Sequence, residues 1–374
     1  MVAALLIAAA GCKGDAGSAC AAGTLAAVAV DAQTPSRTYV ALTSVAGAAY
    51  SILDASNLST LWSATDDGTS LQLFAPSTGG VLVANGGAAA RRIDASGAPL
   101  WSVGYGDVVG VLAALTDTGD LAVVDPQSIR CYGSDGTQLW DEALPASIGG
   151  VSALVADRQG GVWLVGTFTG GLSPWVAAAP SPTGVQPSGP FVLHLDGQGD
   201  EIGGGAWNLP ALAFHQAAEA MDADGAPMLV VTGGGSEVVA PAFGLPAAAG
   251  EVAIAAAFGS GGQILWSRTI ASVPDLRADA EGNLLALTSS TGALSVDRWD
   301  SDGNPGSSVA FVVDATNRVG LRWAAAPVAR GLVVGGEEIV AADGEEDASC
   351  NGRHFLVQLT TDPLAIEALP SRLP

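Results

Sequence analysis

Apolar and polar residues alternate in a recurring order along most of this chain. A polar turn containing glycine leads into a short apolar segment, most clearly at 116–124 "TDTGDLAVV", 156–166 "ADRQGGVWLVG", 222–233 "DADGAPMLVVTG" and 279–289 "DAEGNLLALTS". Weaker copies occur at 31–44, 75–86 and 326–336. Short apolar runs bounded by Gly, Asp, Asn and Ser are typical of strands joined by hairpins. We therefore predict an all-β chain of antiparallel strands.

A second motif places a polar turn, a short spacer and a tryptophan in that order. The stretch "DASGAPLW" ends at Trp101, and similar stretches end at Trp62, Trp140 and Trp266. In a hairpin the turn joins two strands, and a large flat ring that follows it can fill the space between two packed sheets. We expect these four tryptophans to be core residues between neighbouring sheets.

The shortest distances between successive copies of the first motif are about 40 residues, which is the size of a four-stranded propeller blade. We predict a seven-bladed β-propeller over residues 24–370, with four antiparallel strands per blade. In this prediction each blade begins with the strand after the Asp-x-x-Gly turn. The last blade then lacks one strand, and the apolar segment "TLAAVAVDA" at 24–32 is expected to join it and close the ring.

Two stretches, "RRIDASGAPLW" and "YSILDASNLSTLW", resemble the PQQ-type propeller repeat. The later unit that begins with "GGVWLVGTFTGG" is similar to the SBBP-type propeller repeats of secreted and lipid-anchored bacterial proteins. These resemblances imply the fold and not an activity, because propellers host many functions. Quinoprotein enzymes of the PQQ type use an adjacent cysteine pair, and this sequence has no Cys-Cys dipeptide.

The first residues, "MVAALLIAAAGCKGD", resemble a bacterial lipoprotein signal. The resemblance implies that residues 1–11 are removed, that Cys12 carries the lipid, and that 12–23 form a flexible tether. The sequence departs from the family pattern at Ala9 and lacks a basic residue before the apolar run, so an ordinary apolar N-terminus is the alternative. We expect an extracytoplasmic, lipid-anchored protein at the bacterial outer membrane, on its periplasmic side or at the cell surface.

Charge narrows the classes of partner. The formal net charge is -23 and the pI is about 4.1, and such a surface repels nucleic-acid phosphates and anionic lipid headgroups. We therefore expect contact with the membrane only through the lipid anchor, and no nucleic acid. A monomer that binds an envelope protein, a peptide or a carbohydrate is the expected form.

Long insertions favour a binding function. They fall within 167–190, 232–250 and 335–352, which the predicted division places between strands one and two of blades 4, 5 and 7. Such loops emerge on one face of a propeller, where Trp175 and Phe243 would be apolar ligand contacts. The predicted function is a binding or assembly scaffold. The alternative is a propeller hydrolase or lyase with paired carboxylates at the channel mouth.

Candidate metal chemistry is sparse, and we expect no cofactor. The three histidines, His194, His215 and His354, have no metal-ligand spacing, and strand-like surroundings predict that His194 and His354 are packed or rim residues. In "DSDGNPGSS", Asp300, Asp302 and Asn304 alternate as at the start of a calcium loop, but the late bidentate glutamate is missing. We favour a hairpin turn there and keep calcium as the alternative.

Cysteine positions complete the prediction. Cys20 precedes the closing strand and Cys350 lies in the long loop of the last unit, so both would belong to one blade. In an oxidising compartment they are expected to form a disulfide, unless Cys20 lies in the tether beyond reach. Cys131, within the strand-like "SIRCYGSDG", is expected to be a buried free thiol.

Overall fold

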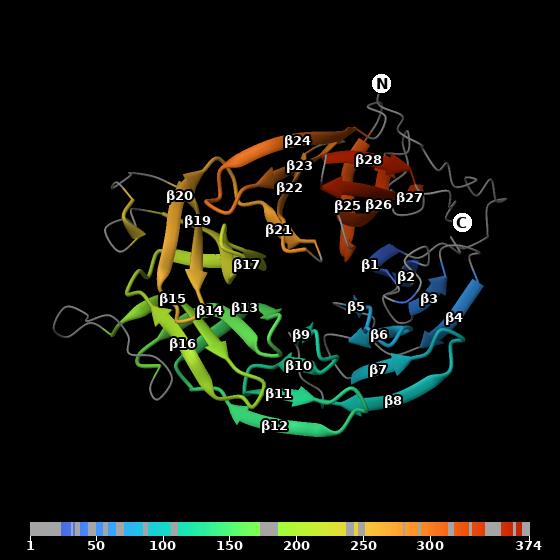
Figure 1. Ribbon diagram of the computed structural model, residues 1–374, viewed down its shortest axis with the longest axis horizontal. Helices are drawn as coiled ribbons and strands as arrows, with labels where there is room; N and C mark the ends of the chain where they lie inside the picture. Colours follow the sequence, from blue (N-terminus) through green and yellow to red (C-terminus); the bar gives the residue numbers. More distant parts are fainter. Residues whose placement is uncertain are drawn as a thin grey trace.

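Antiparallel strands form nearly all the regular structure in the computed structural model (Figure 1). The structure describes residues 24–30, 33, 38–43, 50–54, 59–64, 71–84, 89–105, 111–172, 186–236, 243–245, 251–279, 281–290, 293–312, 318–328, 331–340, 353–361 and 364–368. Within these residues the strands group into seven four-stranded sheets, and each sheet takes its strands in chain order.

The first sheet contains β1 (Thr24–Val30), β2 (Thr38–Thr43), β3 (Tyr50–Asp54) and β4 (Ser59–Ala64). The second contains β5 (Gln72–Phe74), β6 (Val81–Ala84), β7 (Ala89–Ile93) and β8 (Pro99–Gly104). The third contains β9 (Leu112–Leu115), β10 (Leu121–Val124), β11 (Ser128–Tyr132) and β12 (Gln138–Ala143). The fourth contains β13 (Ile148–Ala156), β14 (Val162–Thr169), β15 (Ser188–Leu195) and β16 (Glu201–Ala206).

The fifth sheet contains β17 (Leu212–Met221), β18 (Pro227–Ser236), β19 (Glu251–Gly259) and β20 (Ile264–Ile270). The sixth contains β21 (Asp275–Ala278), β22 (Leu284–Ser290), β23 (Ala293–Trp299) and β24 (Pro305–Val312). The last contains β25 (Arg318–Val328), β26 (Gly331–Val340), β27 (Arg353–Thr361) and β28 (Leu364–Ala368).

The sheets are arranged in a ring, as Figure 1 shows. The first strand of each sheet lies next to the first strand of the following sheet, and β1 packs against β25 to close the circle. The chain is therefore a β-propeller. Because consecutive strands are antiparallel, the turns between strands one and two and between strands three and four lie on the same face. We call it the turn face.

The predicted fold class, a seven-bladed ring in which an N-terminal strand joins the last blade, is wrong in how it divides the chain into blades. The N-terminal strand β1 pairs with β2, with Val28 opposite Val40, and the last sheet takes all four strands from the C-terminal segment. The strand after each Asp-x-x-Gly turn is the second strand of its sheet, not the first. The predicted blades therefore began one strand too late.

Burial explains this error. The second strands β6 and β10 are buried at every position, because the neighbouring sheets cover both of their faces. The first strand β13 is only partly buried, and its segment "IGGVSALVA" has a weaker apolar pattern. The strongest apolar signal in each repeat therefore marks the second strand.

The core lies between successive sheets. Val124 of β10 and Leu164 of β14 belong to one buried cluster that joins the third and fourth sheets. Trp163 and Leu229 belong to the next cluster, which joins the fourth and fifth sheets. Burial of each large apolar side chain stabilises the fold by about 1.5 to 3 kcal/mol. Side chains from alternate faces of each strand thus hold each sheet to both of its neighbours.

The repeated tryptophans connect adjacent sheets at the outer edge of the ring. Trp101 Nε1 donates a hydrogen bond to the Ser134 carbonyl at 2.8 Å. The equivalent bonds run from Trp140 to the Gly197 carbonyl at 2.9 Å and from Trp266 to the Ser301 carbonyl at 2.8 Å. Each acceptor lies in the turn between strands three and four of the next sheet.

Trp62 also packs against the apolar cluster between the first and second sheets. The four tryptophans thus pack between neighbouring sheets as predicted, but they are not core residues, because all four are only partly buried. In three pairs of neighbouring sheets, therefore, a tryptophan donates to the turn between strands three and four of the next sheet. We call this contact the tryptophan–turn contact.

Glycine is required where the tryptophan side chain contacts the turn. Gly303 has a φ of 72°, and its N–H donates to the Asp300 carbonyl at 2.8 Å. A Cβ atom at this position would overlap the ring of Trp266. Glycine therefore supplies both the left-handed conformation and the space for the ring.

The contribution of this contact can be separated from backbone strain with two matched substitutions. Gly225 has a φ of 79° in a turn with the same hydrogen bonds, but nothing lies within 4 Å of a Cβ placed there. Both Gly→Ala changes cost about 1–2 kcal/mol for the left-handed backbone. Gly303→Ala should cost about 1–3 kcal/mol more, because the Trp266 ring must move. Equilibrium urea unfolding measures the difference, and equal losses would contradict the tryptophan–turn contact.

Candidate functional site

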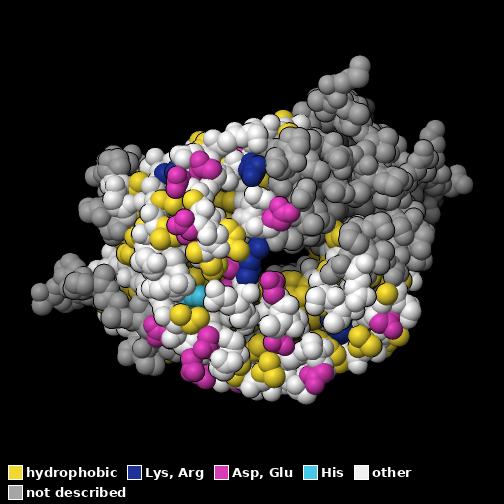
Figure 2. Space-filling model, viewed as in Figure 1, with side chains coloured by type: hydrophobic (Ala, Val, Ile, Leu, Met, Phe, Trp, Pro, Cys, Tyr) yellow, Lys and Arg dark blue, Asp and Glu magenta, His cyan; other side chains and the backbone are white. Residues whose placement is uncertain are grey.

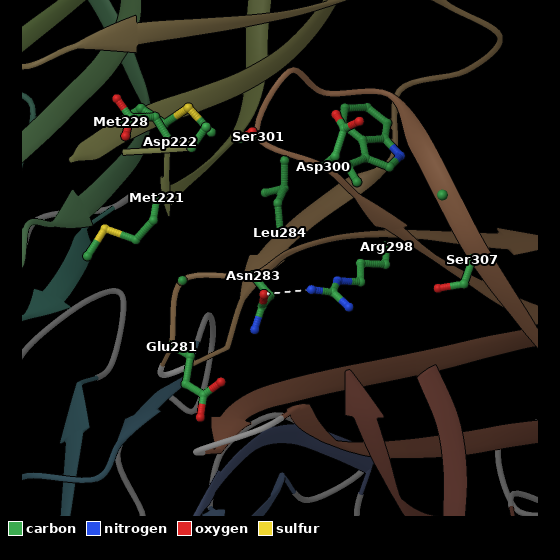
Figure 3. Close-up of a pocket in the computed structure, with 14 residues that line it drawn as sticks. Met221, Asp222, Met228, Glu281, Asn283, Leu284, Arg298, Asp300, Ser301 and Ser307 are labelled. Atoms are coloured by element: carbon green, nitrogen blue, oxygen red, sulfur yellow. Dashed lines mark hydrogen bonds between the residues drawn. The ribbon is translucent and has the colours of Figure 1, made fainter. Parts of the chain in front are cut away.

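A pocket of about 460 Å³ opens on the turn face between the fifth and sixth sheets (Figure 3). One wall comes from the β17–β18 turn, and the opposite wall comes from the β21–β22 turn, the end of β23 and the start of β24. The lining residues are Met221, Asp222, Ala223, Met228, Glu281, Gly282, Asn283, Leu284, Arg298, Trp299, Asp300, Ser301, Gly306 and Ser307.

Methionine is concentrated at this pocket. The sequence contains three methionines, and the two internal ones, Met221 and Met228, both line it. Met228 packs with Leu284 and Trp299 in the apolar cluster beneath the pocket. Thioether side chains are flexible and polarizable, and they suit surfaces that adapt to a bound group.

Hydrogen bonds hold the two walls in place. The Met221 N–H donates to the Gly282 carbonyl at 3.2 Å, which joins the turns of the fifth and sixth sheets. Asp222 Oδ1 accepts bonds from the N–H groups of Asp224 and Ala226 at 2.9 and 2.8 Å. On the opposite wall Arg298 Nη2 donates to Asn283 Oδ1 at 3.0 Å, the bond drawn in Figure 3. The pocket is therefore formed before any ligand arrives.

The three calcium candidates lie in the hairpin turn between β23 and β24. Asp300 Oδ1 accepts bonds from the N–H groups of Asp302 and Asn304 at 3.0 and 2.7 Å. Arg268 Nη1 donates to Asn304 Oδ1 at 2.9 Å, and Nη2 donates to the Asp302 carbonyl. Within the described residues, no three His, Cys, Asp or Glu side chains are grouped so that they could hold a metal. These side chains stabilise the turn.

His194 lies in a buried contact between the fourth and fifth sheets. Its Nε2 atom is 2.6 Å from Asp157 Oδ2, and Nδ1 donates to the Ser260 carbonyl at 3.0 Å. The Trp163 ring stacks on the imidazole with a centroid separation of 3.8 Å and an interplanar angle of 7°. The prediction of a packed histidine is therefore confirmed for His194.

Arg158 joins three sheets near the centre of the ring. Its backbone N–H donates to Glu219 Oε1 at 3.1 Å, and Nε lies 3.6 Å from Oε2. Nη2 donates to the Asp279 carbonyl at 3.2 Å. These bonds of Arg158 link the fourth, fifth and sixth sheets next to the pocket. In Figure 2 acidic side chains are spread over this face of the molecule, while a small group of basic side chains lies beside the central opening.

Glu219 is a buried carboxyl group, with 8% of its surface exposed. Burial raises its pKa to about 7, and the negative charges of Asp157 and Asp117 add to that effect. The hydrogen bond and charge of Arg158 oppose it. Asp157 and Glu219 are thus two buried carboxyl groups near one segment, but each contacts a nitrogen of His194 or Arg158.

The predicted ligand contacts have a different outcome. The long insertions follow β14, β18 and β26, the second strands of the fourth, fifth and last sheets, and these strands end on the face opposite the turn face. Trp175 lies outside the described residues. Phe243 is only 4% exposed and packs against Trp207 and Phe214, with ring centroids 5.2 and 6.1 Å apart. Phe243 is therefore a core residue, not the accessible ligand contact that we expected.

Cys131 on β11 is a buried free thiol, as predicted. Burial is the main cause that raises its pKa to about 12. Cys12, Cys20 and Cys350 lie outside the described residues, and the disulfide stays a prediction. Its original reason, a shared blade, no longer holds because β1 belongs to the first sheet. In the described part of the chain, no helix is sufficiently long and apolar to cross a membrane.

The pocket was not predicted from the sequence. Its residues come from two sheets, and no short motif contains them. The signal that could have indicated it is the position of the two internal methionines on either side of the turn "DADGA". A methionine pair around a turn is a weak pattern in one sequence, since methionine is also a common core residue.

Comparison with known proteins supports the fold. No family model and no curated protein matches the sequence. The WD40 domain of Pan2 from Neurospora crassa has a TM-score of 0.50 and 12% identity, covering 83% of this chain and 86% of that one. The Dos1 propeller has a TM-score of 0.52 and 11% identity, with coverages of 94% and 84%. A chain of the mitotic checkpoint complex has a TM-score of 0.51 and 13% identity, with 83% of each chain covered. At these identities the likeness shows a β-propeller and nothing finer.

The raised pKa of Glu219 predicts a pH-dependent stability. Folding favours the protonated carboxyl, so this contribution is complete below the usual pKa of 4.5 and is lost as the pH rises through about 7. Glu219→Gln should remove a step on the order of 2 to 3 kcal/mol between pH 4.5 and 8. Thermal unfolding of both proteins across this range measures it. A variant whose profile matches that of the native chain would show that Glu219 titrates normally.

Proposed function

We propose that this protein is an extracytoplasmic binding or assembly scaffold that recognises its partner at the turn-face pocket between the fifth and sixth sheets. The observation that carries the proposal is the pocket itself. Its walls are fixed by hydrogen bonds, and the half-buried Met221 adds apolar surface among polar lining residues. Concave sites with an apolar base and a few oriented polar groups are typical of binding sites.

The similarity of this chain to known β-propellers is consistent with a scaffold function but does not identify a partner. One similar chain belongs to the mitotic checkpoint complex, an assembly of proteins, and fold likeness alone does not transfer that role. An envelope protein, or a peptide or carbohydrate presented by it, suits the acidic surface and the proposed location. A second candidate contact surface is the face opposite the turn face, where β14, β18 and β26 end.

We favour binding over the hydrolase or lyase alternative because of Glu219. Its raised pKa is suited to a general acid or base. However, the carboxyl group is almost completely buried, and its oxygens contact the backbone N–H and the guanidinium of Arg158. A catalytic acid must reach its substrate. The described geometry gives Glu219 a role in joining sheets.

Blocking the pocket tests the proposed site. Ser307 lines the pocket and is exposed, so Ser307→Trp should fill it and weaken partner binding at least about tenfold, a change of about 1.4 kcal/mol. Ser308→Trp is the control, because the next residue on β24 points to the other face of the sheet. The Cys12→Ser chain, immobilised with and without each change, captures partners from an envelope extract for quantitative mass spectrometry. Equal capture by both tryptophan variants would exclude the pocket.

The lipid anchor is proposed from the lipoprotein-like N-terminus. Globomycin blocks cleavage of lipoprotein signals, so it should cause a larger precursor to accumulate. Cys12→Ser should move the protein from the membrane fraction to the soluble fraction, because the thiol that accepts the lipid is missing. Fractionation and immunoblotting measure both effects. Membrane association that is unchanged in Cys12→Ser would contradict the anchor.

A further inference from the structure

We propose that the turn-face pocket receives a basic side chain, a lysine or an arginine, from an extended segment of a protein partner. This inference rests on the proposed function and specifies the chemistry of the group bound. It is carried by the charges around the pocket, the apolar surface at its base, and the acidity of the whole chain.

Negative charge exceeds positive charge among the residues that line the pocket. Three of them are carboxylates, Asp222, Glu281 and Asp300, against the single guanidinium of Arg298. Two further guanidinium groups lie near the pocket, that of Arg158 beside Gly282 and that of Arg268 on the Asp300 turn. The whole chain has a formal charge of -23. A basic segment is therefore attracted over a long range and retained locally, whereas an acidic segment is repelled at both distances.

The polar side chains that line the pocket differ in whether an atom is available to bond a ligand. Arg298 already donates from Nη2 to Asn283 Oδ1, which directs the guanidinium along the wall. Asp222 uses Oδ1 to accept two backbone N–H bonds. Its second oxygen, Oδ2, receives no hydrogen bond from the described part of the chain. Asp222 can therefore accept a bond from an ammonium or guanidinium group without loss of its turn.

The base of the pocket suits the stem of such a side chain. Met221, a half-buried lining residue, offers apolar surface beside the carboxylates, whereas Met228, Leu284 and Trp299 beneath it are almost completely buried. Lysine and arginine place their methylene groups on apolar surface while the charged head stays among polar groups. A carboxylate ligand would place its charge near three others, and Arg298 is the one basic residue among those that line the pocket. The observations therefore favour a cationic occupant.

The two internal methionines provide a direct test. The Cys12→Ser chain, labelled with ¹³C at methionine methyl groups, gives signals from Met221, Met228 and Met1, and Met→Leu variants assign them. The ligands are the N-acetyl amides of lysine, arginine, glutamine and glutamate. The lysine or arginine amide should shift the Met221 and Met228 signals saturably, with a Kd on the order of 1 mM. The glutamine amide should bind at least about fivefold more weakly, and added salt should weaken only the cationic amides.

Two variants separate local from general charge. Asp222→Asn keeps the oxygen that caps the turn and removes the charge, so it should weaken lysine amide binding at least about fivefold. Asp224→Asn is the control, because Asp224 lies in the same turn, is exposed and does not line the pocket. Unchanged affinity in Asp224→Asn supports the local site, while equal losses in both variants overturn it.

Other outcomes also decide against the proposal. Tighter binding of the glutamate amide would make the pocket an anion site on Arg298, and equal affinity for all four amides would remove charge selection. The absence of methionine shifts would exclude a basic side chain as the occupant. If Ser307→Trp still abolishes capture of the partner in any of these cases, the scaffold function stands and only this inference fails.

Discussion

The tryptophan–turn contact fixes how neighbouring sheets are placed at three interfaces of the ring, including the one that holds the pocket. Hydrogen bonds between strands occur within each sheet, so neighbouring sheets are held together mainly by side chains. The apolar core supplies most of that attraction, but it has no direction. The bonds from Trp101, Trp140 and Trp266 to carbonyl groups of the next turn are directional. They require a rigid turn, and the capping aspartates and left-handed glycines provide it.

The turn-face pocket depends on the same contact. Ser301, whose carbonyl accepts the Trp266 bond, is one of the lining residues, so the outer wall is held by the fifth sheet. The bond from Met221 to the Gly282 carbonyl holds the inner wall. Arg158 connects the same region to the fourth sheet through Glu219 and Asp279. A site between two sheets can remain open only if neither sheet moves to fill it, and these contacts meet that requirement.

Much of the architecture could be predicted from the sequence, because its determinants are local. Gly, Asp and Asn in the turns and β-branched residues in the strands recur along the chain, and a tryptophan follows four of the outer turns. The division into sheets could not be predicted, since the first strands carry a weaker apolar pattern than the second strands. The ring closure was wrong for that reason. Phe243 was assigned to a surface because it lies in an insertion, yet it packs beside Trp207. The pocket combines residues from two sheets, and no local pattern contains such information.

Binding of the partner at the pocket between the fifth and sixth sheets can be measured by hydrogen–deuterium exchange of the Cys12→Ser chain, alone and saturated with the captured partner. Binding at the pocket should slow exchange at the backbone N–H groups of 223–226 and 281–284 and leave the turn face of the second and third sheets unchanged. Protection confined to the segment 167–190, with no change at either pocket turn, would show that the partner binds elsewhere.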